Sequence, residues 1–240
     1  MKSALIIIGP PEKFGYGHLN RMRLFAFELK RRKWSSQIIC ATENEVVQAQ
    51  LEFDLLLLDR RDTDFPEISS TARPFRRIAI DNRGAGRNRS DVSFDILPHF
   101  DQSEIEFFLS LRHLILHEAI ARQTSLSHKA SIQLIEPPDK VVADFSQKPV
   151  SNSEGLLRLS SSEYIQKLQE AETVRCYYGQ TFFEAVYLGK KIYLECISEY
   201  HKKLSASFLE RTQAQPRWIE HFDGKGVQHL AHEIITVGNR

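Results

Sequence analysis

Short apolar runs, separated by polar and periodic segments, make up the first hundred residues of the chain. The runs cover residues 4–8, 37–41, 54–58, 77–80 and 94–97 and are rich in Ile and Leu. Continuous apolar runs of this length are typical of β-strands that are buried on both faces of a sheet. We therefore expect each of these runs to form a buried strand.

The segments between the first runs carry a helical periodicity. Leu19, Met22 and Leu29 recur at helical spacing within residues 19–34, so that they would form an apolar stripe that packs on the sheet. A shorter helix is expected over residues 43–51. This alternation of strands and helices favours right-handed crossovers and a parallel sheet, and it predicts a fold of the α/β class.

The second half of the chain repeats this rhythm. Strands are expected over residues 131–135, 156–159, 173–178 and 191–196, and helices over 162–170, 180–188, 199–212 and 227–236. The polar stretch 124–129 follows an amphipathic segment and is the expected domain boundary. The sequence thus predicts one domain over residues 1–124 and a second over residues 125–240.

The charge of the chain is nearly balanced, with 32 Lys and Arg against 31 Asp and Glu and a formal net charge of +1. No global field therefore favours nucleic acid or an anionic membrane as a partner. The first apolar run is too short for a signal-peptide core or a membrane span, and the three isolated cysteines form no disulfide framework. We expect a cytoplasmic protein that does not span a membrane and does not bind nucleic acid.

A glycine turn follows the first predicted strand, in the segment GYGHLNR of residues 15–21. Gly15 and Gly17 would let the backbone turn tightly and present N–H groups to a phosphate at the start of a helix. The helix dipole would keep His18 neutral and able to act as a base, and Arg21 could reach an anion. A dinucleotide fingerprint is excluded because Asn20 replaces its third small residue, and the Lys of a P-loop is absent. The alternative is a turn that only joins strand to helix.

The same segment, with the pattern G-x-G-H-x-x-R, resembles the UDP-sugar hydrolases of pseudaminic-acid biosynthesis and the related spore-coat polysaccharide proteins. The resemblance continues at Asp81 and Asn82, which look like the acidic pair at a strand end in that family, and at residues 95–98. It implies a GT-B-like architecture of two Rossmann-like domains, the second of them shortened here. It also implies that Gly15, Gly17, Arg21 and Asn82 contact the substrate.

In the second half, residues 176–191 resemble the nucleotide-binding strand, turn and helix of GT-B enzymes. The resemblance implies that Gly179, Gln180 and Thr181 stand at a helix N-terminus and bind a diphosphate. It also implies that the Glu184 carboxylate binds the ribose hydroxyls. The alternative is that Glu184 only interacts favourably with the helix dipole. Residues 135–139 replace the glycine-rich loop that the family carries.

Taken together, the resemblance implies hydrolysis of a nucleotide sugar, with UDP as the expected nucleotide, at the anomeric carbon during surface-glycan or nonulosonate biosynthesis. His18 would deprotonate the attacking water, and Asp81 would hold His18 or contact the sugar. Backbone donors would carry the diphosphate charge, so that no metal and no cofactor is expected. An acceptor hydroxyl in place of water would make the protein a glycosyltransferase. The shortened second domain leaves a non-catalytic nucleotide-sugar-binding protein as a further alternative.

Two groups of histidines have a spacing that would place them on one helical face. They are His113 and His117 with Glu118, and His229 and His232 with Glu233. Neither group has the His-Glu-x-x-His order of zinc proteases or an evident third ligand. No metal site is therefore expected at either.

A basic segment with Arg83, Arg87 and Arg89 follows the fourth predicted strand. The carboxyl ends of strands are the edge at which α/β sheets bind ligands, so these side chains could hold a phosphate or a carboxylated sugar. The alternative is a mobile surface loop.

Overall fold

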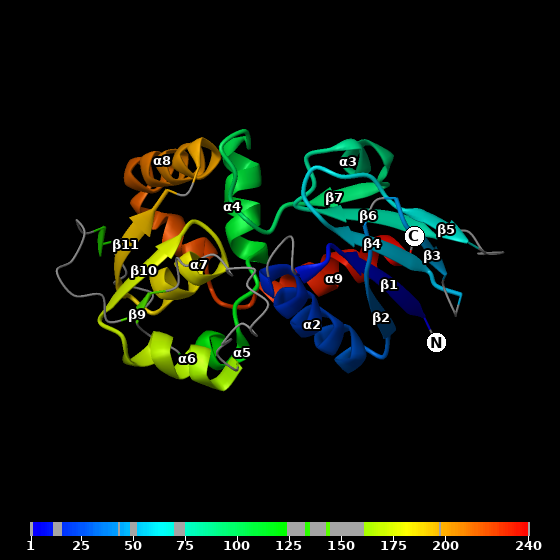
Figure 1. The fold of residues 1–240 in the computed structure, drawn as a ribbon, viewed down its shortest axis with the longest axis horizontal. Coiled ribbons are helices and arrows are strands. Elements are labelled where there is room, and N and C mark those ends of the chain that lie inside the picture. Colours follow the sequence, from blue (N-terminus) through cyan, green and yellow to red (C-terminus); the bar gives the residue numbers. More distant parts are fainter. Residues whose placement is uncertain are drawn as a thin grey trace, which may run out of the picture. The chain divides into compact units, whose positions relative to one another are not determined.

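The computed structural model describes residues 2–11, 16–42, 44–48, 52–69, 75–123, 133–134, 143–144, 161–196 and 198–239. The chain divides into two compact units (Figure 1). The first unit comprises Met1–Pro98, Ser103–Ile115 and Lys225–Arg240, and the second comprises His99–Gln102 and Leu116–Gly224. The sequence-based boundary was placed between residues 124 and 125, and the segment around it lies outside the described residues.

A parallel sheet of five strands forms the centre of the first unit. Its strands are β1 (Ser3–Ile8), β2 (Ser35–Cys40), β4 (Leu55–Asp59), β6 (Arg76–Ile80) and β7 (Val92–Phe94), in the order β2-β1-β4-β6-β7. Every neighbouring pair is parallel. Strands β1 and β4 are buried along nearly their whole length because Ile and Leu side chains cover both faces of the sheet. The predicted α/β class with a parallel sheet is confirmed.

Helices cover one face of this sheet. They are α2 (Tyr16–Arg31) and α9 (Gly226–Gly238), and α4 (Glu104–His113) packs against α9. Ile6 and Leu57 on the sheet share one buried cluster with Phe25 of α2 and with Leu230 and Ile234 of α9. The C-terminal helix therefore belongs to the core of the first unit, although it is far from this core in the sequence.

The opposite face carries a small parallel ribbon of β3 (Val46–Gln48) and β5 (Glu67–Ser69). Val47 is buried there in one cluster with Leu56 and Phe65, whereas Val46 is exposed. The helix that was expected over residues 43–51 is thus wrong for its described part, residues 44–48. The physical reason is that two β-branched residues alternate between core and solvent in an extended strand, where their side chains pack better than in a short helix.

The last strand of the sheet also differs from the expectation. A strand was expected over residues 94–97, but β7 ends at Phe94. The backbone N–H groups of Ile96 and Leu97 donate to the carboxylate of Asp81, at 2.7 and 3.0 Å, instead of to a neighbouring strand. A side chain on the adjacent strand end therefore stops the ladder, which no apolar pattern could reveal.

The unit also contains the short helix α3 (Ala85–Arg89).

The second unit has a four-stranded parallel sheet in the order β8-β11-β10-β9. Its strands are β8 (Gln133–Leu134), β9 (Ala143–Asp144), β10 (Thr173–Tyr177) and β11 (Lys191–Glu195), and its helices are α5 (Glu118–Ala121), α6 (Ser161–Glu170), α7 (Gln180–Tyr187), α8 (Glu199–Ala214) and the 3-10 helix η2 (Pro216–His221). Phe182, Phe183 and Phe208 are fully buried and pack edge to face. The strand that was expected over residues 156–159 and the segment 135–139 lie outside the described residues.

Gly226, at the start of α9, gives a first prediction. A Cβ atom at this position would lie 2.1 Å from the carbonyl oxygen of Leu114, which is backbone and cannot rotate away. Gly226→Ala should lower the free energy of unfolding by about 1–3 kcal/mol, measured by urea denaturation. Gly179→Ala is the control, because its Cβ would meet nothing nearer than Tyr177 Cε2 at 3.5 Å and should cost about 0.5 kcal/mol or less. Equal losses in the two variants would contradict the close approach of α9 to Leu114.

Candidate functional site

A group of charged side chains lies at the carboxyl edge of the first unit's sheet. The chain passes from β1 to β2 on one side of β1 and later to β4 on the other side, so that the strand order reverses at β1. In open α/β sheets this switch point is where ligands bind. Asp59 is the last residue of β4, Asp81 directly follows β6, and α2 begins beyond the end of β1. Functional side chains are therefore expected on these three elements.

His18, Arg21 and Asp59 are in direct contact at this edge. The Nδ1 atom of His18 lies 3.0 Å from Oδ1 of Asp59. The Nε atom of Arg21 donates to Oδ2 of Asp59 at 2.8 Å, and its Nη2 atom donates to Oδ1. Asp59 is fully buried and Arg21 is 4% exposed, whereas the His18 side chain keeps 18% of its surface open. The His18 imidazole thus lies next to the buried ion pair of Arg21 and Asp59 and is the part of this group that keeps some exposed surface.

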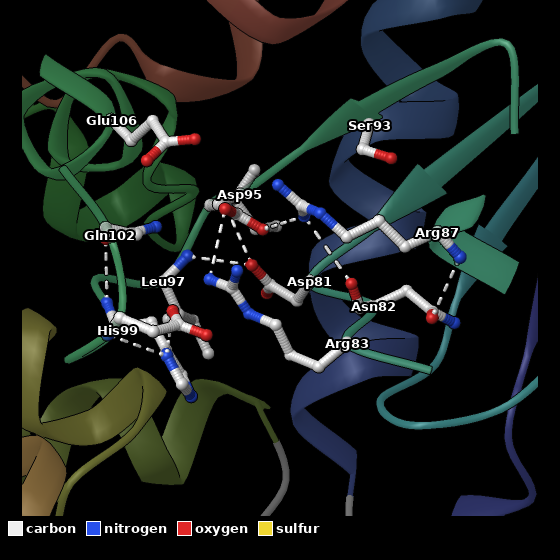
Figure 2. A network of polar contacts seen from close by, with 12 residues as sticks. Asp81, Asn82, Arg83, Arg87, Ser93, Asp95, Leu97, His99, Gln102 and Glu106 are labelled. Atoms are coloured by element: carbon white, nitrogen blue, oxygen red, sulfur yellow. Dashed lines mark hydrogen bonds and ion pairs between the residues drawn. The ribbon is translucent and has the colours of Figure 1, made fainter. Parts of the chain in front are cut away.

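Asp81 lies on the far side of Arg21. Its Oδ2 atom is 2.9 Å from Nη1 of Arg21, and its Oδ1 atom accepts the backbone N–H groups of Ile96 and Leu97. Figure 2 shows Asp81 next to Leu97. The backbone at Asp81 has a φ of 49°, in the left-handed region that few residues other than glycine adopt. The sequence offered Asp81 as a partner of His18 or as a contact of the sugar, and the carboxylate that contacts the imidazole is that of Asp59.

The two carboxylates share Arg21 unequally. Burial alone would raise the pKa of Asp59, but the charges of Arg21 and His18 and their hydrogen bonds outweigh it and hold this pKa below the ordinary aspartate value. For Asp81, burial and the nearby charges of Asp59 and Asp95 raise the pKa, against the opposing effect of Arg21. Burial would lower the pKa of Arg21, but both carboxylates raise it above its ordinary value. Asp59 is therefore the firmly ionised partner.

The other residues of the predicted glycine turn differ in their positions and contacts. Gly15 lies outside the described residues, and Gly17 is in the first turn of α2, half-buried. Arg21 was expected to bind an anion of the substrate. Its three nitrogen atoms instead contact Asp59 and Asp81, so that its charge is already balanced inside the protein.

Asn82 was expected to contact the substrate, and it is fully buried. Its Nδ2 atom donates to the carbonyl oxygens of Arg60 and Thr63 at 2.7 and 2.9 Å. Its Oδ1 atom accepts the backbone N–H group of Gly84 and that of Arg87, the second of which is drawn in Figure 2. These four bonds use the side chain's ordinary donor and acceptor capacity, so that Asn82 organises the loop after β6.

The basic segment that follows is ordered by ion pairs. Arg83 and Arg87 each contact Asp95, at 3.1 and 3.0 Å, as Figure 2 shows. Arg89 contacts Asp64 at 2.6 Å. The sequence left open two interpretations, a site for a phosphate or a carboxylated sugar and a mobile surface loop, and these ion pairs test neither of them. The three arginines have carboxylate partners within the unit.

In the second unit, Glu184 is 2% exposed and its carboxylate is enclosed. Its Oε1 atom accepts from Nε2 of Gln180 at 3.0 Å and from the backbone N–H of His117 at 3.1 Å, and its Oε2 atom accepts from the hydroxyl of Tyr164. The same hydroxyl lies 3.1 Å from Oγ1 of Thr181. The structure thus brings Gln180 and Thr181, at the start of α7, together with Glu184 in the middle of the same helix. Gly179 is the residue before this helix.

Glu184 gives a second prediction. Burial raises its pKa, and the hydrogen bonds from Tyr164, Gln180 and His117 oppose this only in part. A carboxyl group whose pKa is higher in the folded state than in the unfolded state stabilises the folded protein. This contribution to the free energy of unfolding is complete below the unfolded-state pKa and is lost as the pH rises through the folded-state pKa. Urea midpoints measured from about pH 4.5 to pH 7 should therefore fall more steeply in the wild type than in Glu184→Gln. The exposed Glu210→Gln should keep the wild-type slope, and equal slopes in all three proteins would contradict the argument.

Two functional candidates were missed by the sequence reasoning. Asp59 closes the apolar run of β4, and Tyr164 lies on α6. A signal for Asp59 was present, because an aspartate at the end of a central strand lies at the same edge as the glycine turn that follows β1. No signal identified Tyr164, because its contact with Glu184 joins two helices that are separate in the sequence.

Among the described residues, no three His, Cys, Asp or Glu side chains are grouped so that they could hold a metal ion. His113 instead contacts Glu233 of α9 at 2.9 Å. No helix in the described ranges is both long enough and apolar enough to cross a membrane.

Comparisons with known proteins add no relative. No family model matches the chain, and no curated protein and no solved structure matches it either. The geometry within each unit and the motif resemblance therefore support the function proposed below.

Proposed function

We propose that the protein hydrolyses a nucleotide-activated sugar, with a UDP-sugar as the substrate, and that His18 is the general base. The observation that carries this proposal is the state of the His18 ring. Its Nδ1 atom is held by the buried Asp59 carboxylate, and its Nε2 atom has no hydrogen-bond partner among the described residues. An imidazole held at one nitrogen and accessible at the other is the usual arrangement of a general base.

In this reaction the oxygen of a water molecule attacks the anomeric carbon, and the bond from this carbon to the diphosphate oxygen breaks. His18 takes the proton of the water at Nε2, and the ionised Asp59 stabilises the imidazolium that forms. The nucleoside diphosphate leaves as an anion. By resemblance, the backbone N–H groups at Gly179, Gln180 and Thr181 bind it, so that the reaction needs no metal and no cofactor.

The proposal includes the properties that the resemblance implies. These are a GT-B-like architecture of two Rossmann-like domains, a place in surface-glycan or nonulosonate biosynthesis, and a cytoplasmic location. The parallel sheets of the two units and the switch point at β1 support the Rossmann-like part of this proposal.

A second candidate is a non-catalytic protein that binds nucleotide sugars. The replacement of the family's glycine-rich loop by residues 135–139 favours it. The enclosure of Glu184 opposes ribose binding in both candidates, because a carboxylate whose two oxygens already accept bonds from Tyr164, Gln180 and His117 binds ribose hydroxyls only after those bonds are replaced. A glycosyltransferase would differ from the hydrolase only in the attacking group, which is an acceptor hydroxyl in place of water. The same experiment distinguishes the two activities.

The experiment combines calorimetry with an assay for free UDP. UDP, UDP-glucose and UDP-N-acetylglucosamine are titrated into the full chain, and the UDP released from the two sugars is then measured. Binding with release in buffer alone supports hydrolysis. Release only after an acceptor sugar is added indicates a transferase, binding without release indicates the second candidate, and no binding of any nucleotide removes all three.

A further inference from the structure

We propose that Asp59 is a positioning residue that keeps the His18 proton on Nδ1 and the lone pair on Nε2, and that Arg21, held in turn by Asp81, fixes Asp59. The catalytic consequence rests on the proposed function, because only a base that acts through Nε2 needs this tautomer. The tautomer itself is a property of the folded protein without substrate.

Two tautomers of His18 compete in this geometry. The Nδ1 atom lies 3.0 Å from Oδ1 of Asp59 and also 3.0 Å from Nη2 of Arg21. If Nδ1 carried no proton, it would accept from Arg21 and Nε2 would carry the hydrogen. If Nδ1 carries the proton, it donates to Asp59 and leaves Nε2 as the acceptor.

The charges decide between the two tautomers. Asp59 is ionised and can only accept, so that an unprotonated Nδ1 would place its lone pair 3.0 Å from a carboxylate oxygen. Arg21 already donates to that carboxylate through Nε and Nη2. A proton on Nδ1 removes the repulsion and adds a charge-assisted hydrogen bond. The geometry therefore favours the proton on Nδ1.

The carboxylate itself has little freedom to rotate. Arg21 holds its two oxygens with two different nitrogens, and this bidentate pair is buried. The remaining Nη1 atom of Arg21 contacts Asp81, which is tied to the backbone N–H groups of Ile96 and Leu97. His18 is thus connected to the backbone between β7 and α4 through three successive side chains, from β4, from α2 and from the residue after β6.

Nuclear magnetic resonance of the histidine nitrogens tests the tautomer directly. Long-range proton–nitrogen spectra of the full chain with ¹⁵N-histidine are recorded with the imidazole in its neutral form, and His18→Gln assigns the His18 signals. The wild type should show a protonated Nδ1 and an unprotonated Nε2. Asp59→Asn should populate the opposite tautomer, and Asp81→Asn should do so to a smaller extent.

Kinetics supply the second readout. Asp59→Asn should lower kcat by about 10²- to 10⁴-fold, because fewer molecules carry a usable base, while KM for the UDP-sugar changes by only about twofold. A purely structural role would lower the amount of folded protein and leave the tautomer of the folded fraction unchanged.

Each result has a defined meaning. A wild-type His18 with its proton on Nε2 overturns the inference, and this test needs no variant that could fail to fold. An unchanged tautomer in folded Asp59→Asn overturns it as well. The predicted tautomers in a protein that releases no UDP would support the positioning role and reject the proposed function.

Discussion

Replacement of His18 by alanine is expected to lower kcat for UDP release by about 10²- to 10⁴-fold, which is the contribution that a well-placed general base makes. The affinity for UDP should stay within about twofold of the wild-type value, because the proposed role of His18 concerns the attacking water and not the nucleotide. Stability should change little, since the ring is partly exposed and the pair between Arg21 and Asp59 remains in place.

The measurement is steady-state UDP release together with calorimetric titration of UDP. His221→Ala is the matched control, because this exposed histidine lies at the end of η2 in the second unit, outside the proposed machinery. The control should keep the wild-type kcat. Turnover by His18→Ala at the wild-type rate would remove His18 from the mechanism.

Arg21→Met should give the largest loss of stability. The substitution keeps a long side chain but leaves Asp59 as a fully buried carboxylate without its guanidinium partner. Removal of one member of a buried ion pair typically costs about 3–5 kcal/mol, because the remaining charge is neither hydrated nor neutralised. Urea unfolding of the purified chain measures this loss.

Two further variants make this prediction specific. The double variant Arg21→Met with Asp59→Asn should be more stable than Arg21→Met alone, because it removes the unpaired charge. Arg31→Met on the same helix breaks a pair with Glu28 in which Arg31 is 62% exposed, and it should change stability by no more than about 1 kcal/mol. A loss in Arg21→Met as small as that in Arg31→Met would contradict the buried-pair description.

The parts of the fold that follow local patterns could be predicted from the sequence. Strands β1 and β4 coincide with the apolar runs because a strand buried on both faces needs an apolar residue at almost every position. In β6 this holds for its buried residues 78–80. The predicted helix before β2 is present as α2, although it begins at Tyr16 and ends at Arg31. Lys33, with a φ of 64°, leaves the helical conformation and ends the helix before Trp34.

The parts that depend on contacts between distant segments could not be predicted. The return of α9 to the core of the first unit depends on Leu230 and Ile234 fitting beside Phe25, and a period of apolar residues does not specify the partner. The same limit applies to Val47, whose strand exists because β5 pairs with it. Local propensity decides an element only where tertiary contacts do not override it.

The candidate site shows the same division. The sequence identified His18 and Arg21 because a glycine turn between strand and helix has a local signature. It offered Asp81 as a partner of His18 or a contact of the sugar and did not single out Asp59, because the carboxylate that meets His18 depends on how the strand ends lie next to each other. Glu184 was expected in the first turn of a helix and lies one turn further along, in the middle of α7, and its enclosure by Tyr164 depends on a different helix.

Hydrolysis in ¹⁸O-labelled water shows whether the bond from the anomeric carbon to the diphosphate oxygen is the bond that breaks. The full chain is incubated with UDP-N-acetylglucosamine, and the masses of the released sugar and of UDP are measured by mass spectrometry. The samples are taken at early times, before the free sugar exchanges its anomeric oxygen with water. If water activated by His18 attacks the anomeric carbon, the label appears in the sugar and the UDP stays unlabelled. Label in the UDP, or no release of UDP from any UDP-sugar that binds, would contradict the account.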